Sequence, residues 1–403
     1  MSSLPLNKAA VLLALGLAAG IFLPSVGDAG PASDPPLGLW ITCLDPESPL
    51  NNPGQVEKLV SFAEQGKFKI LFVQVYRADK AWFLSETADS SPYLEAREKA
   101  GGIDPLQELI DRAHGKGIEV HAWINTLTLS RNFQSAFLKE SGDEILTKDQ
   151  YGNSAVKNEE ALEAPYRYYE QENQLFLEPG DPRVKERVLR VVAELIRAYP
   201  TLDGIHFDYI RYPAAPPFIP GSRFNAVGLS YGYGERNVER FRQAHGFDPH
   251  DVRGQADKAL LWDRWKREQI TELLRECSRQ IKASDPSKQV SCAVVPSFDR
   301  AYHAAGQDWG KWLEENIIDF AVLMNYSVDH RAVWLGSRAA VGIAGDPRRI
   351  AIGLGAYLLE KDPTAFQEQI DASRRLGPRA VVLFDYSAAS RLSTAKSVSM
   401  DEE

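Results

Sequence analysis

The chain has 403 residues, of which 44% are hydrophobic and 25% charged, a composition typical of a soluble globular protein with one large or two medium domains. Its formal net charge of −9 at pH 7 argues against a nucleic-acid partner, because such a protein needs a basic surface to neutralise phosphates. An acidic substrate would have to be met by local cations, since the overall field repels it.

Residues 1–29 have the pattern of a secretory signal peptide. Lys8 precedes an apolar run at 9–23, and small residues follow up to Ala29, near the expected cleavage site. The run is short for a membrane span, so a signal anchor is the less favoured alternative. We therefore expect an exported protein, periplasmic or secreted, with no membrane span in its mature form and a Pro-rich linker at 30–37.

Eight short apolar segments alternate with helical patterns along the rest of the chain. The expected strands are 37–43, 69–76, 118–125, 202–213, 290–295, 319–326, 350–356 and 380–386. The expected helices are 56–65, 105–114, 182–196, 262–281, 308–315, 331–340 and 364–376. Two of these helices begin with Asp-Pro, at 104–105 and 181–182, where Asp is expected at the cap and Pro in the first turn.

Two long segments, 126–180 and 214–253, lack strong periodicity, as functional loops often do. No break in composition divides the chain into two domains. We therefore predict an α/β fold, a single (β/α)₈ TIM barrel over 38–395 with long loops after strands three and four, and a frayed tail at 396–403. An open doubly wound sheet is the alternative, but no strand is followed by a Gly-rich dinucleotide fingerprint.

Polar side chains gather where the expected strands end, which is where barrels bind their ligands. In segment 202–213, strand alternation places Ile205, Phe207 and Tyr209 on one face. It places His206 and Asp208 on the other face, toward the barrel interior. The expected substrate-binding residues at all strand ends are Gln74, Tyr76, His121, Trp123, Asn125, His206, Arg211, Tyr212, Asn325, Tyr326 and Tyr357.

This set suits a sugar site. Aromatic rings cover the apolar face of a pyranose, amides and Arg bind hydroxyls, and two carboxylates supply acid, base or nucleophile. Asp208 is the first candidate, although a buried Asp that only pairs with Arg211 is the structural alternative. The second carboxylate stays open; the candidates are Asp385, Asp329, Glu178 and Asp79.

His121, His206 and Asp208 are also candidates for a metal site. Without a third imidazole or a close Cys pattern, hydrogen bonding in the core is the preferred interpretation, and no cofactor or metal is expected. The three cysteines, Cys43, Cys277 and Cys292, are widely spaced, and we expect them to be buried as small hydrophobic residues.

Several segments resemble, in order, the bacterial barrels of glycoside-hydrolase-like family 10. They read GLWIT at 38–42, FVQVY at 72–76, HGKGIEVHAWIN at 114–125, LEPGDP at 177–182 and DGIHFDYIRYP at 203–213, followed by Asn325 and Tyr326. The resemblance implies an exported (β/α)₈ glycosidase with a polysaccharide substrate, and some relatives cut peptidoglycan strands stripped of stem peptides. Many relatives carry a second Asp where this chain has Tyr209, and a Gln where it has Asn325.

The sequence therefore predicts an exported glycoside hydrolase that cleaves O-glycosyl bonds of a polysaccharide by carboxylate chemistry, with peptide-stripped peptidoglycan as a candidate substrate. The first alternative is a non-catalytic carbohydrate-binding barrel, in which no second carboxylate faces Asp208. The second is a metal-dependent hydrolase or deacetylase, which needs His121, His206 and Asp208 to converge on one point.

Overall fold

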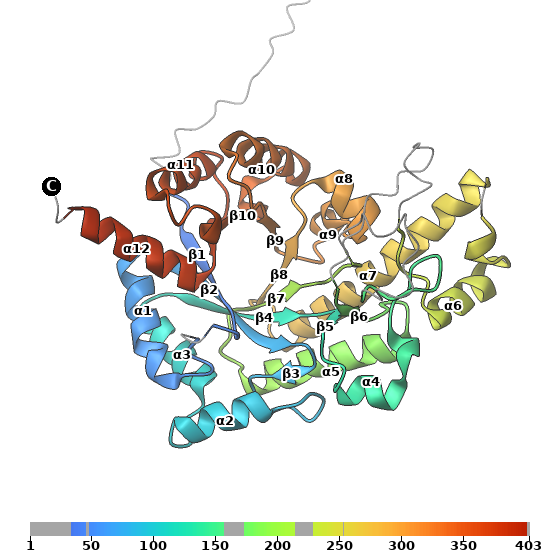
Figure 1. Cartoon of the computed structure of the whole chain (residues 1–403), viewed down its shortest axis with the longest axis horizontal. Helices are drawn as coiled ribbons and strands as arrows, with labels where there is room; N and C mark the ends of the chain where they lie inside the picture. The colour runs from blue at the N-terminus through green and yellow to red at the C-terminus, as the bar shows by residue number, and fades with distance from the viewer. Residues whose placement is uncertain (1–33, 46–47, 157–172, 214–228, 253, 401–403) are drawn as a thin grey trace, which may run out of the picture. The chain divides into compact units, whose positions relative to one another are not determined.

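Eight parallel strands close into a barrel (Figure 1). They are β1 (Leu37–Ile41), β2 (Phe68–Arg77), β4 (Glu119–Asn125), β7 (Gly204–Asp208), β8 (Gln289–Val294), β9 (Phe320–Met324), β10 (Ile350–Gly355) and β11 (Ala380–Phe384). Each strand pairs with the next in this order, and β11 pairs with β1, which closes the ring. The predicted (β/α)₈ barrel is confirmed, and the open doubly wound sheet is excluded because such a sheet has two free edges.

The computed structural model describes residues 34–45, 48–156, 173–213, 229–252 and 254–400. The signal peptide predicted at 1–29 lies outside these residues, as do parts of both predicted long loops. Within the described ranges, no helix combines the length and the apolar character that crossing a membrane requires.

The helices follow the strands along the chain, with α12 after the last strand, and they surround the barrel in Figure 1. The larger ones are α1 (Val56–Gln65), α3 (Pro105–His114), α5 (Pro182–Ala198), α7 (Ala256–Ser284), α9 (Trp309–Glu314), α10 (His330–Ala344), α11 (Pro363–Arg374) and α12 (Tyr386–Met400). Asp104 and Asp181 cap α3 and α5 as predicted, because each side chain accepts hydrogen bonds from first-turn N–H groups. Pro follows each cap at the first helical position.

Side chains alternate along the strands between two cores. Outward-facing residues such as Ile124 and Phe207 pack with the helices in the larger core. The inward-facing residues fill the barrel, and they are Trp40, Ile70, Phe72, Trp123, Phe320, Val322, Ala351, Ala380 and Val382. The His206 ring lies among them, with its centroid 4.5 Å from that of Phe72. The alternation predicted for segment 202–213 is therefore confirmed up to Asp208.

The long connections contain elements that the sequence patterns did not predict. They are β3 (Lys80–Ala81), α2 (Ser91–Lys99), β5 (Thr128–Ser130), α4 (Ala136–Ser141), β6 (Leu175–Phe176), α6 (Glu235–His245) and α8 (Phe298–Arg300). Helix α2 buries only Tyr93 and Ala96, so it lacks an apolar stripe. Helix α6 lies inside the predicted loop 214–253 because Val238 and Phe241 form a small separate core with Trp262.

Candidate active site

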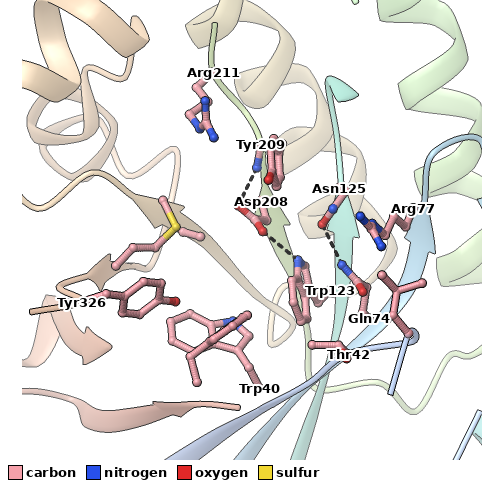
Figure 2. Close-up of a pocket in the computed structure, with 14 residues that line it drawn as sticks. Trp40, Thr42, Gln74, Arg77, Trp123, Asn125, Asp208, Tyr209, Arg211 and Tyr326 are labelled. Carbon is pink, nitrogen blue, oxygen red and sulfur yellow. Dashed lines mark hydrogen bonds between the residues drawn. The ribbon is translucent and has the colours of Figure 1, made fainter. Parts of the chain in front are cut away.

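A cavity of about 280 Å³ opens where the barrel strands end (Figure 2). Its lining residues are Trp40, Thr42, Leu44, Gln74, Arg77, Trp123, Asn125, Asp208, Tyr209, Arg211, Ala293, Met324, Tyr326 and Phe384. Six of them were predicted as site residues, and they are Gln74, Trp123, Asn125, Asp208, Arg211 and Tyr326. Parallel strands bring their carboxyl ends to one face of a barrel, which explains why residues so far apart in sequence meet here.

Asp208 is the last residue of β7 and is 7% exposed. The indole N–H of Trp123 donates to its Oδ2 at 3.2 Å, and the backbone N–H of Tyr209 donates to its Oδ1 at 2.7 Å. Figure 2 shows both bonds. One donor on β4 and one in the residue that follows β7 fix the orientation of the carboxylate. Among the described lining residues, Asp208 is the one carboxylate.

Tyr209 corrects the predicted strand pattern. Strand β7 ends at Asp208, and Tyr209 has a φ of +51°, in the left-handed region. Regular strand geometry therefore stops at Asp208. Tyr209 packs against the larger core that holds Ile205 and Phe207, as predicted, and it also lines the pocket. The Arg211 guanidinium lies over the Tyr209 ring, 4.7 Å from its centroid, so the two side chains form one wall.

A chain of hydrogen bonds crosses three strand ends on another side of the pocket. The Gln74 Oε1 accepts from the Cys43 backbone N–H at 3.2 Å and from the Cys43 thiol at 3.1 Å. The Gln74 Nε2 donates to the Asn125 Oδ1 at 3.0 Å. Asn125 is aligned with Asp208 in the pairing of β4 with β7, so this chain ends beside the carboxylate.

Aromatic rings form the remaining wall. The Trp40 centroid lies 5.8 Å from that of Phe384 and 6.4 Å from that of Tyr326. Tyr357 is not a lining residue, but its ring lies 6.1 Å from Tyr326 and is 46% exposed. The aromatic surface therefore continues from the pocket toward solvent at Tyr357.

The two predicted histidines lie inside the barrel and do not line the pocket. His206 Nε2 accepts from the Trp40 indole N–H at 3.2 Å, and its Nδ1 lies 2.9 Å from the Ser291 hydroxyl. Burial lowers the pKa of His206 well below its usual value, which keeps the ring neutral. His121 Nε2 instead lies 3.4 Å from Glu119. Both ring nitrogens of His206 are thus engaged, and the three candidate ligands do not converge as the metal-dependent alternative needs.

Asp385 directly follows the lining residue Phe384, at the end of β11. Burial raises the pKa of its carboxyl above the usual value, and the charge of Asp45 raises it further. Burial also raises the pKa of Tyr326, and the charges of Asp208 and Asp385 both add to this effect. Tyr326 is therefore close enough to sense both carboxylates.

The other predicted carboxylates lie away from the pocket lining. Asp329 caps α10 by accepting from the Arg331 and Ala332 backbone N–H groups. Glu178 is fully buried, and it accepts from the Gly180 and Gly234 backbone N–H groups, each at 3.1 Å. Asp385 also accepts from a backbone N–H, that of Ala388 at 3.1 Å, but it directly follows a lining residue. Asp329 and Glu178 do not adjoin a lining residue, so we do not carry them into the proposal below.

Asp79 and three predicted binding residues also have supporting positions. Asp79 forms a buried ion pair with Arg187, and the Tyr76 hydroxyl lies 3.5 Å from the same carboxylate. The Tyr212 hydroxyl donates to Glu178 at 3.4 Å. Asn325 donates to the Val333 carbonyl at 2.8 Å and so holds α10 against β9. None of the four lines the pocket.

Sequence reasoning missed eight lining residues, and they are Trp40, Thr42, Leu44, Arg77, Tyr209, Ala293, Met324 and Phe384. Arg77 was missed because the second strand was expected to end at Tyr76, whereas β2 extends to Arg77. Extending the second strand by one residue would have found Arg77. Tyr209 was missed because strand alternation placed it on the outward face, whereas its positive φ interrupts that alternation.

Residues 37–334 match the protein family described as Glycosyl hydrolase-like 10. Glycosyl hydrolase DigH from Escherichia coli is 25% identical over 382 residues, which cover 84% of this chain and 77% of DigH. Glycosyl hydrolase YngK from Bacillus subtilis is 22% identical over 354 residues, which cover 79% of this chain and 60% of YngK.

Solved structures with similar folds include two beta-galactosidases. The enzyme from Bacillus circulans sp. alkalophilus has a TM-score of 0.55 at 11% identity, covering 87% of this chain and 50% of that chain. Gan42B, a GH42 beta-galactosidase from G. stearothermophilus, has a TM-score of 0.53 at 12% identity. The match covers 88% of this chain and 52% of Gan42B. The chain spans about half the length of these structures, and the likeness concerns the barrel fold alone.

Proposed function

The chain belongs to the glycosyl hydrolase-like 10 family, and from this premise we propose that it is a glycoside hydrolase with Asp208 as one of its catalytic carboxylates. The observation that carries the proposal is the oriented carboxylate of Asp208 in a pocket of amide, guanidinium and aromatic groups at the strand ends. Such groups bind the hydroxyls and the apolar face of a sugar while the carboxylate acts on the glycosidic bond.

Glycoside hydrolysis usually needs two carboxyl groups, one to protonate the leaving oxygen and one to act as nucleophile or base. We assign the acid role to Asp385, because its raised pKa keeps a proton on the carboxyl at higher pH than for an ordinary Asp. Asp208, held by the Trp123 indole and the Tyr209 backbone N–H, then faces the anomeric carbon as nucleophile or base. The aromatic wall around Trp40 and Tyr326 supplies the stacking surface for the sugar.

We further propose that the protein is exported and acts on a polysaccharide, with peptide-stripped peptidoglycan as the first candidate. The signal-peptide pattern of residues 1–29 and the resemblance to envelope glycan hydrolases support this proposal. The exposed ring of Tyr357 beside the pocket also suits a polymer better than a single sugar.

The test is an activity screen on residues 30–403, comparing the wild type with Asp208→Asn. Both proteins are incubated with peptide-stripped peptidoglycan and a panel of common polysaccharides, and products are identified by mass spectrometry. We expect cleavage by the wild type and a loss of about 10³-fold in the variant, with an unchanged melting temperature. Equal turnover by the two proteins would contradict the assignment of Asp208.

The carbohydrate-binding barrel remains the second candidate, because Asp208 is the one carboxylate among the described residues that line the pocket. This alternative predicts glycan binding without cleavage by the wild type. Isothermal titration with the same panel separates the two functions, because it detects binding whether or not hydrolysis occurs.

A further inference from the structure

Arg77 is a half-buried pocket residue with no protein acceptor among the described residues. It is the last residue of β2, and its guanidinium lines the cavity. No hydrogen bond or ion pair links this guanidinium to a carboxylate or carbonyl in the described part of the chain. A guanidinium has five N–H donors in a planar fork, so Arg77 presents unused donors to whatever fills the cavity.

The nearby charges in the sequence are already paired. Asp79, two residues later, is buried and accepts from Arg187 and Ser135. Lys80 pairs with Asp89 at 3.7 Å. Local ion pairing therefore accounts for the neighbours of Arg77 and leaves Arg77 itself available.

The pocket is rich in positive charge compared with the rest of the chain. Arg77 and Arg211 both line it, whereas Asp208 is the one carboxylate among the described lining residues. In Figure 2, Arg77 lies on the side of Gln74 and Asn125, and Arg211 lies on the side of Tyr209. In a chain with a net charge of −9, two arginines in one small cavity are the local cations that an acidic substrate requires.

The two arginines differ in how they are held. Arg211 stacks on the rings of Tyr209 and Phe176, with its guanidinium carbon 4.7 and 5.6 Å from their centroids, and it donates to the Tyr212 carbonyl at 3.0 Å. The stacking covers the face of the Arg211 guanidinium, and the hydrogen bond uses one of its N–H donors. Arg77 has neither among the described residues, so it is the better candidate to bind a ligand through two parallel hydrogen bonds.

We propose that Arg77 binds a carboxylate on the sugar substrate, so that the pocket selects an acidic glycan over its neutral counterpart. This inference rests on the proposed function, since it concerns the same pocket. The planar fork of a guanidinium matches the two coplanar oxygens of a carboxylate, and a charge-assisted pair of this kind is strong in a partly buried site.

The experiment compares ligand binding by variants that all carry Asp208→Asn, so that the ligands are not hydrolysed during the measurement. Oligosaccharides from peptide-stripped peptidoglycan, polygalacturonate and polymannuronate are each compared with a form whose carboxylates have been reduced to alcohols. Titration calorimetry gives the dissociation constants of each ligand for three proteins: the parent with Arg77, the Arg77→Lys variant and the Arg77→Met variant. Arg375→Met is the matched control, because Arg375 is exposed at the end of α11, which leads into the amino end of β11.

With Arg77 present, at least one acidic oligosaccharide should bind about 10- to 100-fold more tightly than its reduced form, the range expected for a hydrogen-bonded charged group. Arg77→Met should abolish this difference, Arg77→Lys should restore part of it, and Arg375→Met should leave it unchanged. Equal weakening of acidic and reduced ligands by Arg77→Met, or no acidic ligand preferred by the parent protein, would overturn the inference.

Hydrolysis by the wild type is followed in parallel on the same ligand pairs. This second measurement distinguishes a failure of the proposed catalysis from a failure of the proposed role of Arg77. If neutral glycans are cut as well as acidic ones and Arg77→Met changes nothing, the glycosidase stands and the carboxylate role of Arg77 is refuted. If nothing is cut but the carboxylate preference disappears in Arg77→Met, the binding role stands and the proposed catalysis fails.

Discussion

At the scale of single residues, the environment of Asp385 decides how the proposed chemistry responds to pH. Its carboxyl is half-buried. Burial is the main cause that raises its pKa, and the neighbouring negative charge of Asp45 raises the pKa further. An acid catalyst must hold its proton, so activity should fall as pH rises through this raised pKa. The alkaline limb of the pH–rate profile therefore reports Asp385 if the assignment is right.

Asp45→Asn should move that limb toward lower pH. Removing a negative charge takes away one cause that raises the pKa of Asp385, so the acid loses its proton at lower pH. We expect a shift of less than about one pH unit that shrinks with added salt, because the half-buried Asp45 is partly screened. The measurement is kcat/KM from pH 4 to 9 on the substrate found in the screen.

Asp371→Asn is the control for this shift, since Asp371 is an exposed carboxylate on α11 that accepts from Gln367. It should leave the profile in place. An alkaline limb that stays fixed in Asp45→Asn would mean that another group donates the proton.

The candidate site shows what strand alternation can and cannot reveal about individual residues. It identified Asp208, Trp123 and Asn125, because an inward position at a strand end follows from a period of two. It did not separate Asp385 from Asp329 and Glu178, since all three lie in or beside loops. Whether a loop carboxylate caps a helix, supports a turn or borders a cavity depends on tertiary contacts that the period does not encode.

At the scale of elements, β10 packs against the pocket residue Trp40. Gly353 lies so close to Trp40 that a Cβ built on it would be 2.7 Å from the indole ring, and it would also collide with the Leu323 backbone oxygen. Trp40 is buried and lines the pocket. The absence of a side chain at 353 thus allows the indole to lie where the proposed sugar would stack.

Gly353→Ala should therefore displace Trp40 and weaken both the fold and the site. We expect a loss of about 1–3 kcal/mol in the free energy of unfolding, as for other overpacked cores, together with weaker ligand binding. Urea unfolding followed by circular dichroism measures the first effect, and titration calorimetry measures the second.

The same substitution at Gly342 is the matched control. Gly342 lies in α10, and a Cβ there meets no atom within 4 Å. Ala is the better helix former, so Gly342→Ala should raise the free energy of unfolding by about 0.5–1 kcal/mol. A stabilised Gly353→Ala variant would show that β10 and the indole adjust freely, contrary to our expectation.

Sequence patterns predicted the regular elements well and the inserted ones poorly. Every barrel strand was predicted, and α3 and α5 begin at their predicted Asp-Pro caps. These signals are local, because caps and apolar periods lie within a few residues of each other. The loop elements α2, α4 and α6 were missed, since helices with few buried apolar residues carry little periodicity.

At the scale of the whole molecule, the three cysteines report on global unfolding. All three are buried and unpaired, as predicted. Burial raises the pKa of the Cys43 thiol to about 12 and raises those of Cys277 and Cys292 as well. A thiol must ionise to react, so each one is protected by both its pKa and its inaccessibility.

We therefore expect the native protein to react with Ellman's reagent only on the timescale of unfolding, and the denatured protein to release three equivalents at once. Mass spectrometry of alkylated peptides assigns each thiol. A cysteine that titrates within minutes in the native state would reveal local opening near that residue, and Cys43 would place the opening beside the pocket.

The hydrogen-bond chain from Cys43 through Gln74 to Asn125 has a fixed direction, because it begins at a main-chain N–H that can only donate. Gln74 must therefore turn its oxygen toward Cys43 and its NH₂ toward Asn125. Asn125 must turn its own oxygen toward Gln74, which leaves its NH₂ for the pocket. The backbone after β1 thus dictates, two side chains away, that a ligand atom bound by the Asn125 NH₂ must be an acceptor. Rotating either amide would break this chain of hydrogen bonds, so the polarity is fixed.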